Sequence, residues 1–219
     1  MRTESRGSPC LDVSPSLQLL EGGRKGSMND SPAIEHRLTE DVDLHFEAMV
    51  REHQDRLYAF ARRLSNQRED AEEIVQDAFV RAYKALKTYD AERIRSMALR
   101  SWLYQITLNV ARNRARGRKP VTETLNGEAL ERHADTAEGP HAKLEASRRR
   151  ADLATLVAGL PSRYRAPLIL RYVEGLKLEE VAQILKQPLG TTKSNVHRAI
   201  NALREAITRS RREMRWNHA

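Results

Sequence analysis

The side chains best suited to specific chemistry are the amides, hydroxyls and cations near the C-terminus, in PLGTTKSNVHRAINALREAI at 188–207. If Val196 faces a core, helical steps of about 100° per residue place one set of polar side chains on the opposite side of the helix and a second set on its flanks. The opposite group is Ser194, Arg198 and Asn201, and the flanking group is Lys193, Asn195 and His197. Such donors and acceptors recognise base edges and phosphates.

A polar outer face is also typical of a helix that is simply solvated. Three features favour DNA over that interpretation, and the first is the turn at Pro188 and Gly190 just before the helix. The basic run RSRREMRW follows at 209–216, and no outward-facing glutamate precedes Glu205. We therefore predict that this helix binds DNA.

A second pattern lies in SWLYQITLNVARNRAR at 101–116. An indole, two amides and a guanidinium recur at spacings of three and four, and further cations follow: Trp102, Gln105, Asn109 and Arg112, then Arg114, Arg116, Arg118 and Lys119. This combination suits melted DNA, because bases stack or are hydrogen-bonded while cations neutralise phosphates. We expect Trp102 to pack with partial exposure and Asn109 to be the better candidate for reading a base.

Acidic residues on a predicted helix at 71–86 offer a third kind of chemistry. Asp70, Glu72, Glu73 and Asp77 could in principle ligate a metal or form an acid–base pair. They spread along an exposed face, however, and no histidine accompanies them at ligand spacing. Nothing else in the chain resembles a nucleophile or a phosphate-binding loop. We therefore predict a protein-docking face, and no catalytic, metal or cofactor site.

Apolar residues at helical spacing predict the elements that carry these side chains. Three stripes at 44–64, 71–86 and 99–116 predict a first helical unit. In the second unit, LKLEEVAQIL at 176–185, a turn and a final helix capped by Thr191 have the spacing of a helix-turn-helix. The predicted fold is all-α: two small helical domains joined by a flexible acidic linker, the C-terminal one a helix-turn-helix.

The domain boundaries follow from where helical periodicity stops. The leader contains prolines, glycines and serines without sustained periodicity, and the linker is acidic between two basic flanks. We predict a disordered leader, a first unit, a linker, a second unit and a tail, at 1–40, 41–117, 118–142, 143–212 and 213–219.

The composition agrees with a nucleic-acid partner. The 219 residues include 38 lysines and arginines against 30 aspartates and glutamates, and the net charge of +8 attracts polyanions. Cys10 is the single cysteine, so no intrachain disulfide can form and a reducing compartment is expected. No apolar run approaches the roughly 20 residues of a bilayer crossing. We expect a soluble, cytoplasmic protein without membrane insertion.

Taken in order, these segments resemble the extracytoplasmic-function (ECF) subfamily of bacterial RNA polymerase sigma factors, over roughly residues 44–210. DAEEIVQDAFVRAYKAL at 70–86 looks like their polymerase-binding segment, and 101–116 looks like the helix that melts and reads the minus-ten element. LPSRYRAPLILRYVEGLKLEEVAQIL at 160–185, with 188–207, looks like their minus-thirty-five-binding domain.

The resemblance implies a dissociable, non-enzymatic initiation subunit. It would bind the β′ and β subunits of core RNA polymerase, recognise both promoter elements and promote melting, for a stress or envelope-response regulon. The first unit would be sigma region 2 and the second sigma region 4. The resemblance also implies promoter DNA and an anti-sigma factor as partners, a nucleoid-associated location in the cytoplasm, and no small-molecule substrate or cofactor.

Carried over residue by residue, the resemblance assigns three sets. The set that meets the β′ clamp helices is Asp70, Glu73, Gln76, Asp77 and Arg81. The minus-ten set, with Asn109 at the base-contacting position, is Trp102, Gln105, Asn109, Arg112 and Arg116. The minus-thirty-five set is Lys193, Ser194, Asn195, His197 and Arg198.

Some positions depart from the family's pattern. The loop at 87–101 looks longer than is usual, Lys177 stands where a capping serine is common, and Lys193 and Ile200 stand where arginine is frequent. Lysine lacks the bidentate fork that arginine offers to guanine, so we expect a different base preference.

Two other functions stay open from the residues alone. One is a stand-alone helix-turn-helix regulator with an N-terminal dimer or ligand domain, and the other is an enzyme acting on nucleic acid. A regulator would bind a palindromic site as two copies, whereas a sigma factor gains specificity only on polymerase.

Overall fold

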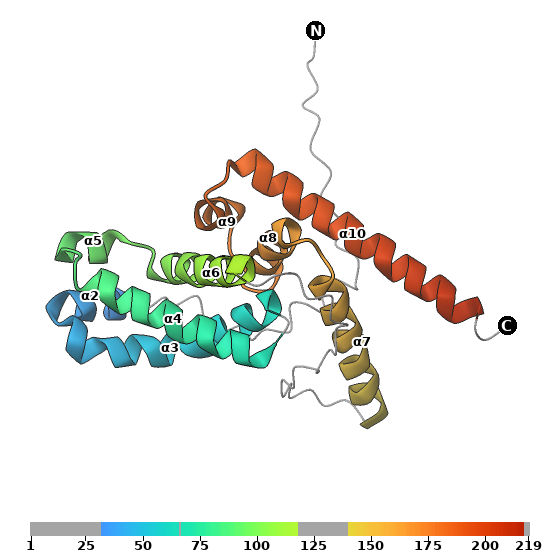
Figure 1. Ribbon diagram of the computed structural model, residues 1–219, viewed down its shortest axis with the longest axis horizontal. Coiled ribbons are helices and arrows are strands. Elements are labelled where there is room, and N and C mark those ends of the chain that lie inside the picture. The colour runs from blue at the N-terminus through green and yellow to red at the C-terminus, as the bar shows by residue number, and fades with distance from the viewer. Residues whose placement is uncertain (1–31, 66, 118–139, 217–219) are drawn as a thin grey trace, which may run out of the picture.

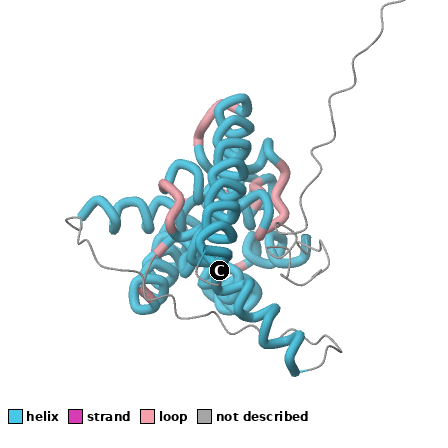
Figure 2. Tube along the Cα trace, turned by 90° about the vertical axis from the view of Figure 1, so that its right-hand side faces the viewer, coloured by secondary structure: helices cyan, strands magenta, loops and turns pink. Residues whose placement is uncertain are grey.

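The structure is a computed structural model that describes residues 32–65, 67–117 and 140–216. Within these ranges the chain forms nine helices and no strand (Figures 1 and 2). The prediction of an all-α fold is therefore confirmed. The helices are α2 (Pro32–Glu40), α3 (Val42–Leu64), α4 (Arg68–Leu86), α5 (Ala91–Ser96), α6 (Leu99–Gly117), α7 (Pro140–Ala158), α8 (Ser162–Tyr172), α9 (Leu178–Leu185) and α10 (Leu189–Trp216).

The first unit is built on α3, α4 and α6, which pack against one another (Figure 1). The apolar stripe that the sequence predicts on each helix faces the other two helices. Phe60 of α3 meets Tyr104 of α6 edge to face, with ring centroids 5.1 Å apart, and Phe46 of α3 meets Tyr83 of α4 in the same way at 5.0 Å. This geometry brings the positive edge of one ring to the negative face of the other. The sides of α4 and α6 that face away from this core point outward.

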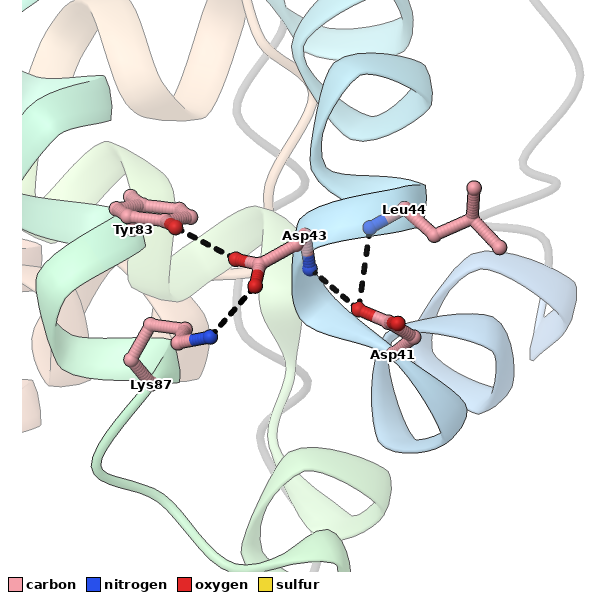
Figure 3. Close-up of polar contacts among 5 residues, drawn as sticks. All are labelled: Asp41, Asp43, Leu44, Tyr83 and Lys87. Carbon is pink, nitrogen blue, oxygen red and sulfur yellow. Dashed lines mark hydrogen bonds and ion pairs between the residues drawn. The ribbon is translucent and has the colours of Figure 1, made fainter.

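A polar cluster ties the start of α3 to the end of α4 (Figure 3). Asp41 caps α3, since its Oδ1 accepts hydrogen bonds from the amides of Asp43 and Leu44 at 2.8 and 3.2 Å. The Asp43 carboxylate in turn accepts from Lys87 Nζ at 2.7 Å and from the Tyr83 hydroxyl at 2.5 Å. Lys87 first, and then Tyr83, hold the pKa of Asp43 below its usual value. The two helices are thus aligned at this end by side chains as well as by the core.

The expectation that the leader is disordered up to residue 40 is wrong for residues 32–40, which form α2. Ile34 and Leu38 are buried, and the helix packs against both α3 and α5. Two apolar residues one turn apart are enough to bury a short helix against a preformed surface, but they are too few to produce a periodic signal. The rest of the predicted leader lies outside the described residues.

The helix-turn-helix of the second unit is formed by α9 and α10. Lys186 ends α9 in the left-handed conformation, with φ of 52°, and the Gln187 amide donates to the Ala182 carbonyl at 3.0 Å. These features turn the chain sharply into α10. The buried faces that the two helices share carry Val181, Ala182, Leu185, Val196, Ile200 and Leu203.

Three predicted boundaries in the second half shift. The final helix begins at Leu189 and not after a Thr191 cap, because Pro188 supplies the first carbonyl, which accepts from the Thr192 amide at 3.0 Å. At its other end α10 continues to Trp216, past the predicted end of the second unit at 212. Residues 140–142 of the predicted linker belong to α7, and the remainder of that linker lies outside the described residues.

We expect Leu38→Ala to destabilise the protein by about 2–5 kcal/mol, since Leu38 is 1% exposed and its removal leaves a cavity under α2. Urea unfolding of the full chain measures this loss. Arg37→Ala is the matched control, because Arg37 lies on the exposed side of the same helix. Equal and small changes in both variants would contradict the docking of α2.

Candidate functional site

The outer face of α10 carries the predicted minus-thirty-five set. Lys193, Ser194, His197 and Arg198 are all exposed on this helix. His197 Nε2 lies 3.0 Å from Asn201 Nδ2, one turn further along, so the imidazole and the amide are held together on this face. Four of the five predicted side chains are therefore accessible together.

Asn195 is the exception in this set. Its side chain points inward and the residue is 9% exposed, because Nδ2 donates to Gln187 Oε1 in the turn at 3.3 Å. The expectation that Asn195 flanks the DNA-binding face is wrong in this respect. Its amide instead fixes α10 against the turn that follows α9.

The predicted minus-ten set lies along α6, with unequal exposure. Asn109 and Arg116 are exposed, and Trp102 is half-buried, as expected for an indole that packs with one edge free. Arg112 is half-buried, and burial first, then the charge of Arg116, lowers its pKa. Gln105 is already engaged, since its Nε2 donates to the Gln183 carbonyl of α9 at 3.2 Å.

A cluster of one aromatic and one cationic side chain lies on the loop before α6, next to Trp102 of the minus-ten set. The Tyr89 ring lies 6.0 Å from that of Trp102, and the Arg93 guanidinium sits 3.6 Å from the Tyr89 ring centroid. Arg93 belongs to α5, the short helix inside the loop that looked unusually long. Helix α2 packs against α5, so α2 also supports this part of the site.

The outer face of α4 carries most of the predicted polymerase-binding set. Glu73, Gln76, Asp77 and Arg81 are exposed there. Asp70 is only 7% exposed, so the expectation that it lies on this outer face is wrong. Its carboxylate is turned toward Arg114 of α6, with Oδ1 3.5 Å from Nε.

Sequence reasoning missed Val80, which is 52% exposed in the middle of this face. It lies one turn from Gln76 and from Lys84 on the helix. The signal was present, because Val80 is the large apolar residue of α4 that falls outside the buried stripe. An apolar side chain surrounded by polar ones is typical of the centre of a protein–protein contact.

The two units touch through a junction centred on Glu174, just after α8. Its side chain is 7% exposed. Tyr104 donates its hydroxyl to Glu174 Oε2 at 2.5 Å, Arg100 donates to the Glu174 carbonyl at 2.6 Å, and Arg63 Nη1 lies 3.7 Å from Oε1. We call these contacts the Glu174 junction. Burial foremost, and then the Glu174 charge, raises the pKa of Tyr104, so its hydroxyl stays a donor.

A third arginine strengthens the same interface. Arg165 Nη1 donates to the Leu64 carbonyl at the end of α3 at 3.2 Å, while its Nε donates to the Leu160 carbonyl within the second unit at 3.2 Å. Burial lowers the pKa of this guanidinium. A cation at the carbonyl end of α3 also complements the dipole of that helix. No pattern in the sequence indicated Glu174 or Arg165.

The described residues offer little for other chemistry. Among them, no group of three or more histidine, cysteine, aspartate or glutamate side chains is placed to hold a metal ion. No helix in the ranges that the structure covers is long and apolar enough to cross a bilayer.

These helices define a class of protein: a two-unit all-α protein that presents cationic and amide side chains on a helix-turn-helix and on a second long helix. Family comparisons divide the chain in the same way. The Sigma-70 region 2 family matches residues 49–121, and the Sigma-70 region 4 family matches residues 150–203.

Known relatives agree along most of the chain. The ECF sigma factor SigW of Bacillus subtilis is 31% identical over 169 residues, covering 74% of this chain and 88% of SigW. The sigma-H factor of Pseudomonas aeruginosa is 31% identical over 173 residues, covering 74% and 86%. SigE of Mycolicibacterium smegmatis is also 31% identical, over 75% of this chain and 62% of SigE, less than two thirds of that protein.

Solved structures share the fold. CnrH, in complex with the cytosolic domain of CnrY, superposes with a TM-score of 0.58 at 22% identity, covering 81% of this chain and 96% of CnrH. The sigma factor RpoE of Bartonella quintana, in complex with the anti-sigma factor NepR, gives 0.57 at 25% identity, covering 74% and 96%.

The chain belongs to the ECF family of RNA polymerase sigma factors, which act in transcription initiation. A stand-alone regulator is not favoured, because the first unit matches sigma region 2 and not a separate ligand or dimer domain. Sigma factors are generally not catalytic.

We expect Glu174→Gln to lower the free energy of unfolding by about 1.5–3 kcal/mol, the range for a hydrogen bond to a charged group, because Arg63 and Tyr104 lose their charged partner. Urea unfolding measures the change. Glu179→Gln is the control, since Glu179 is exposed at the start of α9. A loss no larger than that of the control would contradict the Glu174 junction.

Proposed function

We propose that this sigma factor docks on core RNA polymerase through the outer face of α4 and holds the promoter with α6 and α10. The observation that supports the proposal is that α4, α6 and α10 carry three separate accessible surfaces. One surface mixes acids with an apolar centre, and the other two are cationic and rich in amides.

The polymerase-facing contacts, in this proposal, come from Glu73, Gln76, Asp77, Val80 and Arg81, which meet the β′ subunit, while the second unit reaches the β subunit. The polar members set orientation and Val80 supplies desolvated apolar area at the centre. Asp70 is left out of this contact because its carboxylate is buried.

The promoter contacts are divided between the units. Asn109 reads a base of the minus-ten element, with Trp102, Arg112 and Arg116 beside it for stacking and for phosphates. Lys193, Ser194, His197 and Arg198 enter the major groove at the minus-thirty-five element, and Asn195 holds the turn behind them.

The proposed function also requires the two units to move apart. Gln105 donates to the α9 backbone, so α9 rests on the helix that would bind the minus-ten element. The minus-ten and minus-thirty-five elements are separate stretches of the promoter, so in this proposal the two DNA-binding helices move apart to reach both. The units therefore separate at the Glu174 junction when polymerase and promoter are bound.

The proposal also covers an inhibitory partner protein and the cellular location. The related RpoE was solved with an anti-sigma factor, which supports an inhibitory partner of that kind for this chain. We also propose that the protein acts at the nucleoid in the cytoplasm on a stress or envelope-response regulon, with no catalytic site, cofactor or small-molecule substrate.

Reconstituted transcription tests the proposal directly. Core polymerase with this chain is expected to initiate at promoters identified by sequencing RNA 5′ ends after overexpression. Core alone should not initiate there. Failure to initiate on any template from the source genome would overturn the proposal.

We expect Arg198→Ala to weaken recognition of the upstream element by about 1–3 kcal/mol, the range for a specific base contact. Binding of polymerase holoenzyme to promoters with intact and scrambled upstream elements measures this. Arg204→Ala is the control, because Arg204 is exposed on another side of α10. An equal loss on intact and scrambled sequences would make Arg198 a phosphate contact.

We expect Val80→Asp to weaken core polymerase binding by about 2 kcal/mol or more, the effect of disrupting an interface centre. Folding stability should change little, since Val80 is half exposed. Leu44→Asp is the control, because Leu44 is also an exposed large apolar residue but lies on α3. If both variants bind core polymerase as the parent does, α4 is not the docking face.

A further inference from the structure

Arg114, near the end of α6, is held by two acids of α4. Its Nε lies 3.5 Å from Asp70 Oδ1, and its Nη2 forms an ion pair with Glu73 Oε2. The Asp70 side chain is 10% exposed and that of Arg114 is 29% exposed, so the pair is partly shielded from water. Shielding strengthens the interaction relative to a surface pair.

The position of Arg114 on α6 separates it from its basic neighbours. Arg112 and Arg116 are one turn apart and lie about 40° from each other around the helix, whereas Arg114 lies about 160° from each of them. Arg114 therefore faces α4, while Arg112 and Arg116 occupy the opposite side. The basic run at the end of α6 thus contains cations of two kinds.

Helix dipoles favour the same pairing. Asp70 lies in the first turn of α4, where a negative charge is stabilised, and Arg114 lies in the last turn of α6, where a positive charge is stabilised. Since α4 and α6 pack together, the pair joins the start of one helix to the end of the other. It is an ionic link between the outward-facing docking helix α4 and the helix α6 that carries the minus-ten set.

We propose that Asp70, assisted by Glu73, acts through Arg114 to position the cationic end of α6 for promoter melting. Asp70 and Arg114 are positioning residues and contact neither polymerase nor DNA. This inference rests on the proposed function of the α4 and α6 surfaces. It assigns Asp70 a role in melting and not in docking.

The test uses full-length Asp70→Asn, Arg114→Gln and the double variant with core polymerase. One readout is affinity for core, and the other is the rate of open-complex formation on a duplex promoter and on a promoter whose minus-ten region is already unpaired. Asp43→Asn is the matched control, since Asp43 pairs with α4 at its other end.

We expect each single variant to keep core affinity within about twofold and to form open complexes on the order of tenfold more slowly on duplex DNA, as for the loss of a coupled pair. The unpaired template should restore the rate, because melting is bypassed. The double variant should be no worse than either single variant. Asp43→Asn should leave both readouts unchanged.

Three results would overturn the inference while the parent protein still initiates normally. Asp70→Asn could lose core affinity as Val80→Asp is expected to, which would make Asp70 a docking contact. The unpaired template could fail to restore the rate, which would indicate a general folding defect. Arg114→Gln could reduce the salt dependence of promoter binding by about one unit of slope, which would make Arg114 a phosphate contact. Failure of the parent protein itself would instead overturn the proposed function.

Discussion

The buried carboxylate of Glu174 is the constraint on which the arrangement of the two units depends. A carboxylate at 7% exposure is costly to bury unless its charge and oxygens are satisfied. Here a phenol and a guanidinium of the first unit satisfy the carboxylate, and a second guanidinium takes the backbone carbonyl of the same residue. The partners of Glu174 come from the first unit, so separation of the units exposes all of these polar groups to water. Water can then replace the hydrogen bonds that the groups lose.

This construction suits the proposed function, in which the two units hold two DNA elements only after they separate. A purely apolar interface would resist opening, since water cannot compensate for exposed apolar area. The two units also share an apolar core, but the polar contacts at Glu174 specify one closed arrangement, and water can replace these contacts when the units part. The side chains proposed to bind DNA lie on the helices α6 and α10 themselves, so separation of the units would leave each set intact. Opening the junction therefore changes which surfaces are reachable without rebuilding any of them.

The sequence predicted those parts of the fold that periodicity controls. The stripes of α3, α4 and α6 and the turn between α9 and α10 are local patterns, and the structure reproduces them. The burial of Asn195 and Asp70 was not predictable, because helical geometry alone does not identify the partners that each side chain meets, among them Gln187 for Asn195 and Arg114 for Asp70. The Glu174 junction joins residues about 70 or more positions apart, and a single sequence holds no signal for such pairs. Val80 was detectable as an apolar residue outside the stripe.

Separation of the two units on the promoter can be tested by measuring a distance between them. Single-molecule energy transfer can follow dyes at Glu52→Cys and Glu179→Cys, both exposed positions, in a Cys10→Ser background that removes the only native thiol. We expect one short distance between the two dyes in the free chain and a longer one once core polymerase and promoter DNA are bound. An unchanged short distance in the active promoter complex would contradict it.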